Sequence, residues 1–188
     1  YGLVGSEMCI RDRYDALMHM NAISIALCHG YMIGGGAVLP AACDFRVGSP
    51  SVSLTLNEVS IGFNLTWHSM PALVNLVGPH HAKEMLILGR SYGLAELQQF
   101  GYFTDTVADD GDLVSAGERL AAEVLKQPPV PVTVTKASIN ALAMPLGRAI
   151  HQMDHLAVGY MGKSVYSRTA RTSYFDEGVR NWGDEQRG

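Results

Sequence analysis

The chain has 188 residues, of which 47% are hydrophobic and 17% are charged. This balance is typical of a globular protein that can bury a substantial core, and it excludes a disordered or collagen-like chain. The formal net charge of −4 is spread along the sequence without a basic block. We therefore expect neither a nucleic acid nor a membrane surface as a partner.

The cysteines and the apolar stretches bear on the compartment. Cys9, Cys28 and Cys43 have neither CxxC nor zinc-ligand spacing, and an odd number of cysteines without a secretory signal favours reduced thiols. The longest apolar stretches are interrupted by Gly, His or Asn well before the length of a membrane span. These observations predict a cytoplasmic protein without a transmembrane helix.

The first residues are expected to be foreign to the protein. Back-translation of residues 2–12 resembles a transposase-based sequencing adapter read in frame, although a native amphipathic lead-in to Tyr14 is the alternative reading. We expect 1–13 to be an adapter-like, non-native segment and leave it out of the fold argument. The native sequence would then start in mid-protein, with a core over 14–130 and a helical region over 131–188.

The front of the chain mixes strands and a helix. Residues 22–28 are apolar and contain β-branched isoleucines, which predicts a buried strand. A helix from about 35 to 42 follows, and further strands are predicted over 45–47 and 52–55 on either side of a turn at 49–51.

Later elements are mostly helical. Helical spacing covers 67–77 and 80–88, with Gly78-Pro79 between them, and a short helix over 95–100 precedes a short strand over 102–107. A strongly amphipathic helix is predicted over 112–126 with Asp112 as its N-cap. After Pro131 the sequence predicts helices over 132–143, 146 to about 168, and 174–182, so the core carries a helical appendage.

Two features suggest chemistry. Gly34-Gly35-Gly36 begin a helix, whose first backbone N–H groups lack intrahelical partners and can bind a developing oxyanion. Glu58 stands between Leu56 and Ile61, where exclusion of water would raise its pKa and suit it to proton transfer. Together they indicate enolate chemistry. The glycines could instead serve only packing, and the glutamate could be a turn residue bonded to a backbone N–H.

Other site types lack their motifs. The phosphate-binding pattern GxxxxGK[ST] is absent, and GxGxxG fails because Leu39 stands at its third small position. The hydrolase elbow GxSxG is absent as well. Among the histidines, His80 and His81 are expected to face different directions, and the pair His151 and His155 has no third ligand, so we expect no metal site.

At this point the chain resembles the crotonase superfamily of enoyl-CoA hydratases and isomerases. The resemblance covers most of the chain after Tyr14 and rests on the motifs Gly30-Tyr31-Met32-Ile33-Gly34-Gly35-Gly36, Cys43-Asp44-Phe45-Arg46, Leu56-Asn57-Glu58-Val59-Ser60-Ile61-Gly62, Gly78-Pro79-His80-His81-Ala82-Lys83-Glu84-Met85-Leu86-Ile87-Leu88-Gly89 and Ala95-Glu96-Leu97-Gln98-Gln99-Phe100-Gly101. It implies an α/β fold, the crotonase-like ββα spiral, with a C-terminal helical trimerisation region and with the N-terminal strands missing here.

The resemblance also implies roles for residues. Gly35 would donate one oxyanion N–H to a thioester oxygen, while the second donor would come from a loop before Tyr14. Glu58 would be the catalytic residue. We expect the substrate, an acyl-CoA, to contact Met32, Gly34, Val38, Asn57, Ile61 and Thr66, without a further cofactor. The final helices would form subunit contacts in a homotrimer or a dimer of trimers.

The reaction is predicted from one substitution. Hydratases of this family carry two glutamates, and the positions matching them hold Val38 and Glu58 here. Adding water normally divides its proton transfers between two carboxylates, whereas moving a double bond from C3 to C2 needs one base. Leu56-Asn57-Glu58 also resembles the Leu-Asn-Glu of Δ3,Δ2-enoyl-CoA isomerases.

We therefore expect an isomerase, inactive as this fragment alone because one oxyanion donor is missing. The alternatives are a hydratase or another crotonase reaction, such as thioester hydrolysis or decarboxylation, with a group supplied by the missing segment or by His68. A non-catalytic acyl-CoA-binding or assembly paralogue is a third possibility. Trp67 and His68 depart from the hydratase pattern and could reshape the acyl pocket, or serve as a core Trp and a surface His.

Overall fold

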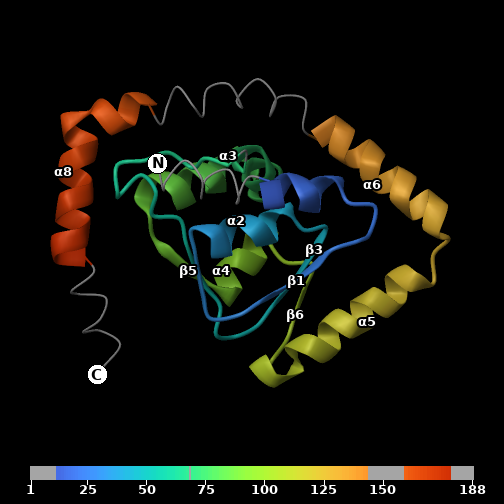
Figure 1. Cartoon of the computed structure of the whole chain (residues 1–188). Coiled ribbons are helices and arrows are strands. Elements are labelled where there is room, and N and C mark those ends of the chain that lie inside the picture. The colour runs from blue at the N-terminus through green and yellow to red at the C-terminus, as the bar shows by residue number, and fades with distance from the viewer. Residues whose placement is uncertain (1–11, 68, 144–158, 179–188) are drawn as a thin grey trace.

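The chain winds through successive turns of strands and helices in the computed structural model, which describes residues 12–67, 69–143 and 159–178. After a helical segment over 12–19 come β1 (Ile25–Cys28), β2 (Tyr31–Ile33) and α2 (Gly35–Ala42). The next turn comprises β3 (Phe45–Gly48), β4 (Ser53–Thr55) and α3 (Met70–Leu88). A third turn has β5 (Ser91–Gly93), α4 (Leu94–Gln99) and β6 (Asp105–Thr106) (Figure 1).

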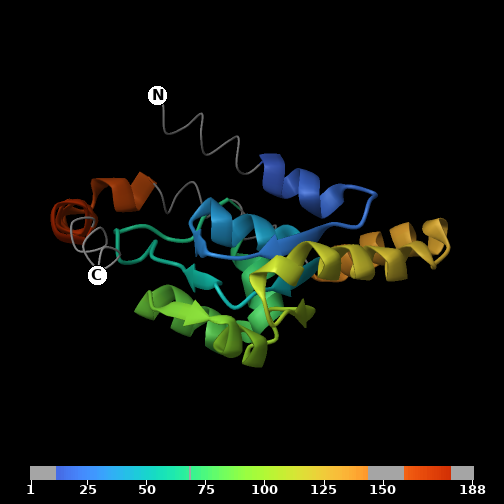
Figure 2. The same ribbon diagram turned by 90° about the horizontal axis from the view of Figure 1, so that it is seen from below.

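The C-terminal part is helical where it is described. A 3₁₀ turn, η1 (Asp110–Asp112), leads into α5 (Leu113–Leu125) and α6 (Pro129–Ala143), and later come α8 (Val165–Ser173) and the π-helical turn η2 (Tyr174–Gly178). Figures 1 and 2 show α5 and α6 on one side of the core and α8 on the opposite side. The described helices include none that is long and apolar enough to cross a membrane.

The strands form two three-stranded sheets that stack equivalent strands of successive turns. One sheet has the order β1-β3-β6 and is parallel throughout, and the other has the order β2-β4-β5. In the second sheet β2 and β4 are parallel, while β5 is antiparallel to β4. Each turn thus contributes one strand to each sheet, which is the arrangement expected of a ββα spiral.

The predicted elements are present in the described regions, with differences in extent. The strand predicted over 22–28 covers only Ile25–Cys28, and that over 102–107 is reduced to Asp105–Thr106. Two strands were not predicted, Tyr31–Ile33 and Ser91–Gly93, because each has three residues and shows no clear alternation. The break predicted at Gly78 is confirmed: α3 consists of two helices that meet at a kink, where Gly78 has the non-helical φ of 73°.

Side-chain caps also differ from expectation. Asp112 occupies the predicted N-cap position of α5, but its side chain makes no capping hydrogen bond. Asp109 caps the preceding 3₁₀ turn instead, accepting a hydrogen bond from the Gly111 N–H at 2.8 Å. The helix predicted over 146–168 falls partly outside the described residues, and it does not continue to 168 because the Ser164 side chain caps a new helix, α8.

The boundaries of the C-terminal helices also differ from the prediction. Helix α6 begins at Pro129, three residues before the predicted start at 132, since proline is well tolerated in the first helical turn. The predicted helix over 174–182 is seen only as η2, and its remainder lies outside the described residues, as do residues 1–11 of the adapter-like segment. The domain boundaries expected at 130 and 131 stay predictions.

The main core lies around α2 and α3. It combines buried side chains from β2, α2, β4 and α3 with Leu97 and Tyr102 of the third turn. Arg46 is buried beside it, 5% exposed, and its guanidinium satisfies three backbone carbonyls. Nε donates to the Tyr102 carbonyl at 2.8 Å, and Nη1 donates to those of Cys43 at 2.7 Å and Pro40 at 3.2 Å. Arg46 therefore joins the end of α2 to the loop before β6.

We predict that Arg46→Met lowers the free energy of unfolding by about 3 kcal/mol, because buried carbonyls left without a donor cost about 1–3 kcal/mol each. Urea denaturation followed by circular dichroism measures this loss. Arg119→Met is the matched control, since Arg119 is exposed on α5 and donates to the Ser115 hydroxyl at 3.3 Å rather than to buried carbonyls. The control should change stability by no more than about 0.5 kcal/mol. Equal losses in the two variants would contradict this role of Arg46.

Candidate active site

The two predicted halves of the site leave the same edge of one sheet. Strands β2 and β4 pair in parallel, with Ile33 opposite Thr55. Gly34 and Gly35 follow β2 directly, and Glu58 comes three residues after the end of β4. Because neighbouring parallel strands end at a common edge, the helix start and the carboxylate emerge on the same side of the sheet.

The start of α2 has free donors and open space. Gly34 occupies the N-cap with φ 55°, a conformation that favours glycine, and its carbonyl accepts the N–H groups of Ala37 and Val38, both at 3.0 Å. The Gly35 N–H precedes these donors and has no partner within the helix. A Cβ built on Gly34 or Gly35 would meet no atom within 4 Å. The helix dipole favours negative charge at this position.

Glu58 is the carboxylate at this edge. Its side chain is buried, with 9% exposed, and Oε2 is inaccessible to solvent without a hydrogen-bond partner in the described part of the chain. Burial raises the pKa of Glu58, and a hydrogen bond involving its own backbone lowers it in part. A carboxylate that is buried, with one oxygen left without a hydrogen bond, gains from taking up a proton, which is the property required of an acid/base group.

Two of the expected substrate contacts lie in the core. Val38 is 2% exposed and Met32 4%, and both belong to the buried cluster that includes Leu54 and Leu56. Val38 therefore lies in an apolar environment on the first turns of α2. In this position it offers neither a hydrogen-bond acceptor nor a base.

The other predicted contacts lie in the segment that follows β4. Asn57, Ile61 and Thr66 are half-buried, and the Thr66 carbonyl accepts hydrogen bonds from the Ser69 N–H at 3.2 Å and the Ser69 hydroxyl at 2.6 Å. Thr66 thus lies at the end of the loop, immediately before α3. The substrate contacts themselves stay predictions for all six residues, Met32, Gly34, Val38, Asn57, Ile61 and Thr66.

The loop that carries Glu58 is covered by the C-terminal elements. The Asn57 side-chain amide donates to the Tyr174 hydroxyl at 2.7 Å. The Arg171 guanidinium lies 4.6 Å from the centre of the Phe63 ring, and a Cβ at Gly62 would come within 2.5 Å of the Ser167 carbonyl oxygen. Sequence reasoning missed Tyr174 because 117 residues separate it from Asn57, and no local pattern connects them.

Trp67 is strained at the end of this loop. It is the one non-glycine residue of the described chain with positive φ, at 60°, and its indole Nε1 is buried without a hydrogen-bond partner there. Its ring packs partly against the core cluster. This packing is typical of a core residue, whereas backbone strain and an unpaired donor are common at functional sites. Trp67 therefore stays open to both interpretations, a core tryptophan or a residue that reshapes the acyl pocket. His68 lies outside the described residues.

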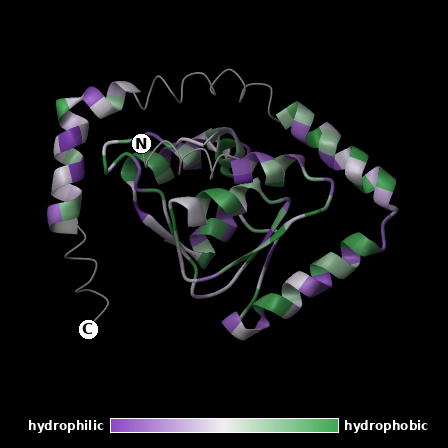
Figure 3. Cartoon of the chain, viewed as in Figure 1, coloured by the Kyte–Doolittle hydropathy of each residue, from purple (hydrophilic) through white to green (hydrophobic). Residues whose placement is uncertain are grey.

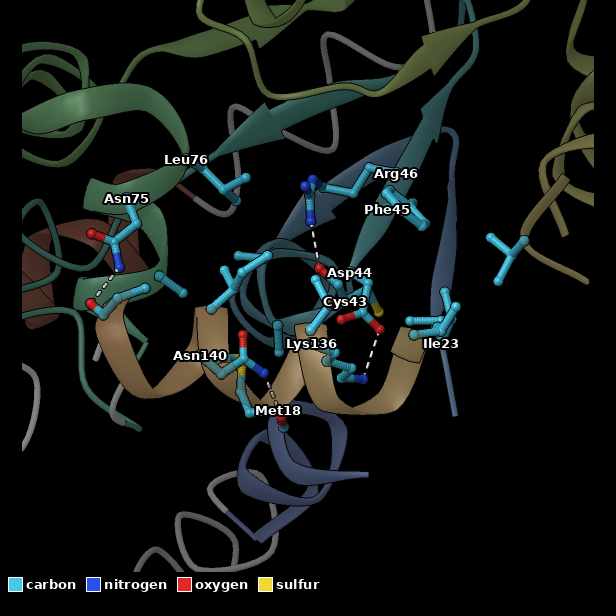
Figure 4. Close-up of a pocket in the computed structure, with 18 of the residues that line it drawn as sticks. Met18, Ile23, Cys43, Asp44, Phe45, Arg46, Asn75, Leu76, Lys136 and Asn140 are labelled. Carbon is cyan, nitrogen blue, oxygen red and sulfur yellow. Dashed lines mark hydrogen bonds and ion pairs between the residues drawn. The ribbon is translucent and has the colours of Figure 1, made fainter. Parts of the chain in front are cut away.

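A separate cavity of about 580 Å³ lies between α6 and the core (Figure 4). Its lining includes Asp44, Arg46 and Lys136 but neither Glu58 nor Gly35. Lys136 Nζ binds Asp44 Oδ2 at 2.7 Å and the Ala22 carbonyl at 2.9 Å, while Arg46 binds backbone carbonyls. Because both cations have protein partners, the cavity offers an apolar space rather than an anion site.

One expectation about histidines is wrong. His80 and His81 do not diverge: their ring centres are 5.1 Å apart, and their ligating atoms lie with those of Glu84 within 4.8 Å of one another. Adjacent residues on a helix are 100° apart around the axis. Glu84, one turn later, lies between the directions of His80 and His81, so both side chains can bend toward it. His151 and His155 lie outside the described residues.

Comparisons with known proteins identify the family. The sequence profile described as Enoyl-CoA hydratase/isomerase matches residues 6–185. Mevalonyl-coenzyme A hydratase SIDH of Beauveria bassiana is 33% identical over 115 residues, which are 61% of this chain and 41% of that protein. The mitochondrial Delta(3,5)-Delta(2,4)-dienoyl-CoA isomerase of Dictyostelium discoideum is 27% identical over 67% of this chain and 43% of its own length.

Comparison with solved structures agrees with this family. The crystal structure of an enoyl-CoA hydratase from Mycobacterium avium subsp. paratuberculosis K-10 superposes with a TM-score of 0.83, at 20% identity, over 93% of this chain and 71% of the other. The chain thus belongs to the enoyl-CoA hydratase/isomerase family, and the predicted crotonase fold is confirmed. It spans less than half the length of the two curated relatives named above.

We predict that Glu58→Gln stabilises the fold more at pH 8 than at pH 4. Burial raises the pKa of Glu58 in the folded state. Between the ordinary pKa and this raised pKa, the folded protein therefore holds the Glu58 proton more often than the unfolded protein does. The free energy of unfolding of the wild type consequently falls as pH rises through this range. The side-chain amide in the Glu58→Gln variant does not ionise, so the variant does not lose stability in this way.

The measurement is the thermal midpoint of both proteins across this pH range, with Glu118→Gln as the control for removing an exposed carboxylate on α5. A difference between Glu58→Gln and wild type that is equal at pH 4 and pH 8 would argue against a raised pKa.

We also predict that Gly62→Ala detaches α8 from the Glu58 loop. Gly62 has φ 79°, and the added Cβ would meet the Ser167 backbone, which cannot rotate away as a side chain would. Gly101→Ala is the control, because Gly101 has φ 76° and only an ordinary contact at 4.0 Å. Both variants should lose about 1–2 kcal/mol from the left-handed backbone. Gly62→Ala should lose more stability than Gly101→Ala and should speed trypsin cleavage after Arg168 and Arg171. Equal cleavage rates in the two variants would contradict the contact between Gly62 and Ser167.

Proposed function

We propose that this site catalyses an isomerisation, moving a double bond of an enoyl-CoA from C3 to C2 with one glutamate as acid and base. The observation that supports it is that Glu58 is buried at one of the two positions where hydratases hold glutamates and the apolar Val38 is buried at the other. Glu58 is the only buried carboxylate among residues 12–67, 69–143 and 159–176, whose burial the structure describes. By the family resemblance, Val38 stands where hydratases hold their second glutamate.

The proposed chemistry follows from these groups. Glu58 removes a proton from C2 of the 3-enoyl thioester, and the negative charge moves to the thioester oxygen. The Gly35 N–H stabilises that oxyanion, aided by the dipole of α2. The glutamic acid then returns the proton to C4, which leaves the double bond between C2 and C3. One oxyanion donor contributes about 10²–10³ in rate, and acid–base transfer about 10²–10⁴.

Hydration is the second candidate, because the 33% identical relative is named a hydratase. It would require a group that activates water, and Val38 cannot do so. His68, or a residue outside this sequence, would have to supply it. The same resemblance places the second oxyanion donor outside these residues, so the 188-residue chain by itself is proposed to turn over slowly or not at all. A non-catalytic acyl-CoA-binding subunit is the remaining alternative.

Assembly and location are part of the proposal. Helix α6 exposes four large apolar side chains: Val130, Val134, Ile139 and Leu142. Hydrophobic positions recur along the ribbon of this helix (Figure 3). Exposed apolar residues on a projecting helix are typical of subunit contacts, which supports a homotrimer or a dimer of trimers. We propose a cytoplasmic enzyme that needs no cofactor besides the coenzyme A of its substrate.

The deciding experiment assays the protein expressed from its complete gene with 3-enoyl-CoA and 2-enoyl-CoA. We expect isomerisation of the first to fall about 10²–10⁴-fold in Glu58→Gln, with little hydration of the second. Glu118→Gln, which removes an exposed carboxylate of α5, should retain full activity.

Three outcomes would overturn the assignment. Isomerisation that survives Glu58→Gln would remove Glu58 from its role. Efficient hydration of 2-enoyl-CoA by wild type would favour the hydratase, and binding of acyl-CoA without turnover of either substrate would favour the non-catalytic subunit.

A further inference from the structure

The second half of α3 carries a cluster of metal-ligating side chains that the proposed reaction does not use. His80, His81 and Glu84 follow the kink at Gly78 and each offers one ligating atom, all within 4.8 Å of one another. On a helix, residue 84 lies 40° around the axis from residue 80 and 60° from residue 81, so in projection along the axis it stands between the two histidines. The three therefore occupy one narrow face of α3.

His81 has an unused buried nitrogen. Its Nδ1 is inaccessible to solvent and has no hydrogen-bond partner in the described part of the chain. The nearest carboxylate atom, Glu84 Oε2, is 3.6 Å away, which is too long for a hydrogen bond. With metal–ligand bonds of about 2.0–2.2 Å, two ligands on a tetrahedral zinc ion lie about 3.4 Å apart. The observed separation is close to that value.

Packing holds His81 in this orientation. Its ring stacks on Phe100 with centres 3.9 Å apart and planes inclined by 19°. Phe100 follows α4, so the ring is fixed between two elements and cannot turn freely toward another partner. His80 is exposed and can rotate, which allows its imidazole to close the remaining distance. The cluster thus combines one fixed nitrogen, one nearby carboxylate and one adjustable imidazole.

We propose that His80, His81 and Glu84 form a Zn²⁺ site with a water molecule in the fourth position. Two imidazoles and a carboxylate are a common ligand set for tetrahedral zinc, and a charged ion would satisfy the buried Nδ1 of His81. Bound to the folded state alone, the ion would stabilise the second half of α3 and its contact with Phe100. The site is independent of the reaction proposed for Glu58.

The test is titration of the metal-free 188-residue chain with Zn²⁺ by isothermal titration calorimetry. We expect one saturable site and a higher thermal midpoint with Zn²⁺. His80→Asn and Glu84→Gln should each weaken binding at least about tenfold, since even changes to groups outside the coordination sphere cost about 10–100-fold. His29→Asn, at an exposed histidine far from the cluster in sequence, is the matched control and should leave the affinity unchanged.

Substitution by Co²⁺ identifies the ligand type. We expect the absorption of a tetrahedral nitrogen and oxygen site without sulfur charge transfer. Three results would each overturn the proposal: no saturable Zn²⁺ binding, an affinity that is equal in wild type, His80→Asn and Glu84→Gln, or a thiolate band that assigns the metal to a cysteine. His80→Asn is the more informative variant, because His80 is exposed and its loss leaves the stack of His81 on Phe100 intact.

Discussion

The parallel pairing of β2 with β4 is the constraint on which the site depends. Its register, with Ile33 opposite Thr55, makes Gly35 and Glu58 leave the sheet at the same edge although they are separated by a whole turn of the spiral. A slip of one residue would turn the side chains of β2 to the opposite face. The core resists such a slip, because Met32 and Leu54 are both buried at paired positions.

Burial then gives each group its chemical character. Val38 and Leu56 belong to the cluster that excludes water near the start of α2, and Glu58 is the charged group left beside it without a partner for Oε2. The free energy needed to hold an unpaired carboxylate in such surroundings raises its pKa. A fold built for stability alone would not place a glutamate there, so the destabilising position itself indicates a function.

The C-terminal elements complete this environment. Tyr174 and Ser167 contact the loop around Glu58, and Arg171 lies over Phe63. These contacts order a loop that otherwise consists of turns, and they link the helical region to the site. In the second half of α3, His81 stacks on Phe100 and belongs to a second polar cluster with His80 and Glu84. One spiral core thus positions two chemically different sets of side chains.

The sequence by itself determined the order of the main elements and the family, and it singled out Gly35 and Glu58 as the candidate donor and carboxylate. These are local properties: strand and helix periodicity, a glycine-rich helix start and a glutamate in an apolar turn can be recognised within a few residues. The short strands β2 and β5 could not be predicted, because their residues show no clear alternation and their pairing comes from neighbours in the sheet.

Only the tertiary structure decided which distant residues meet. Tyr174 reaches Asn57, and the side chains of His80, His81 and Glu84 converge, because packing of whole elements sets these contacts and no local pattern encodes them.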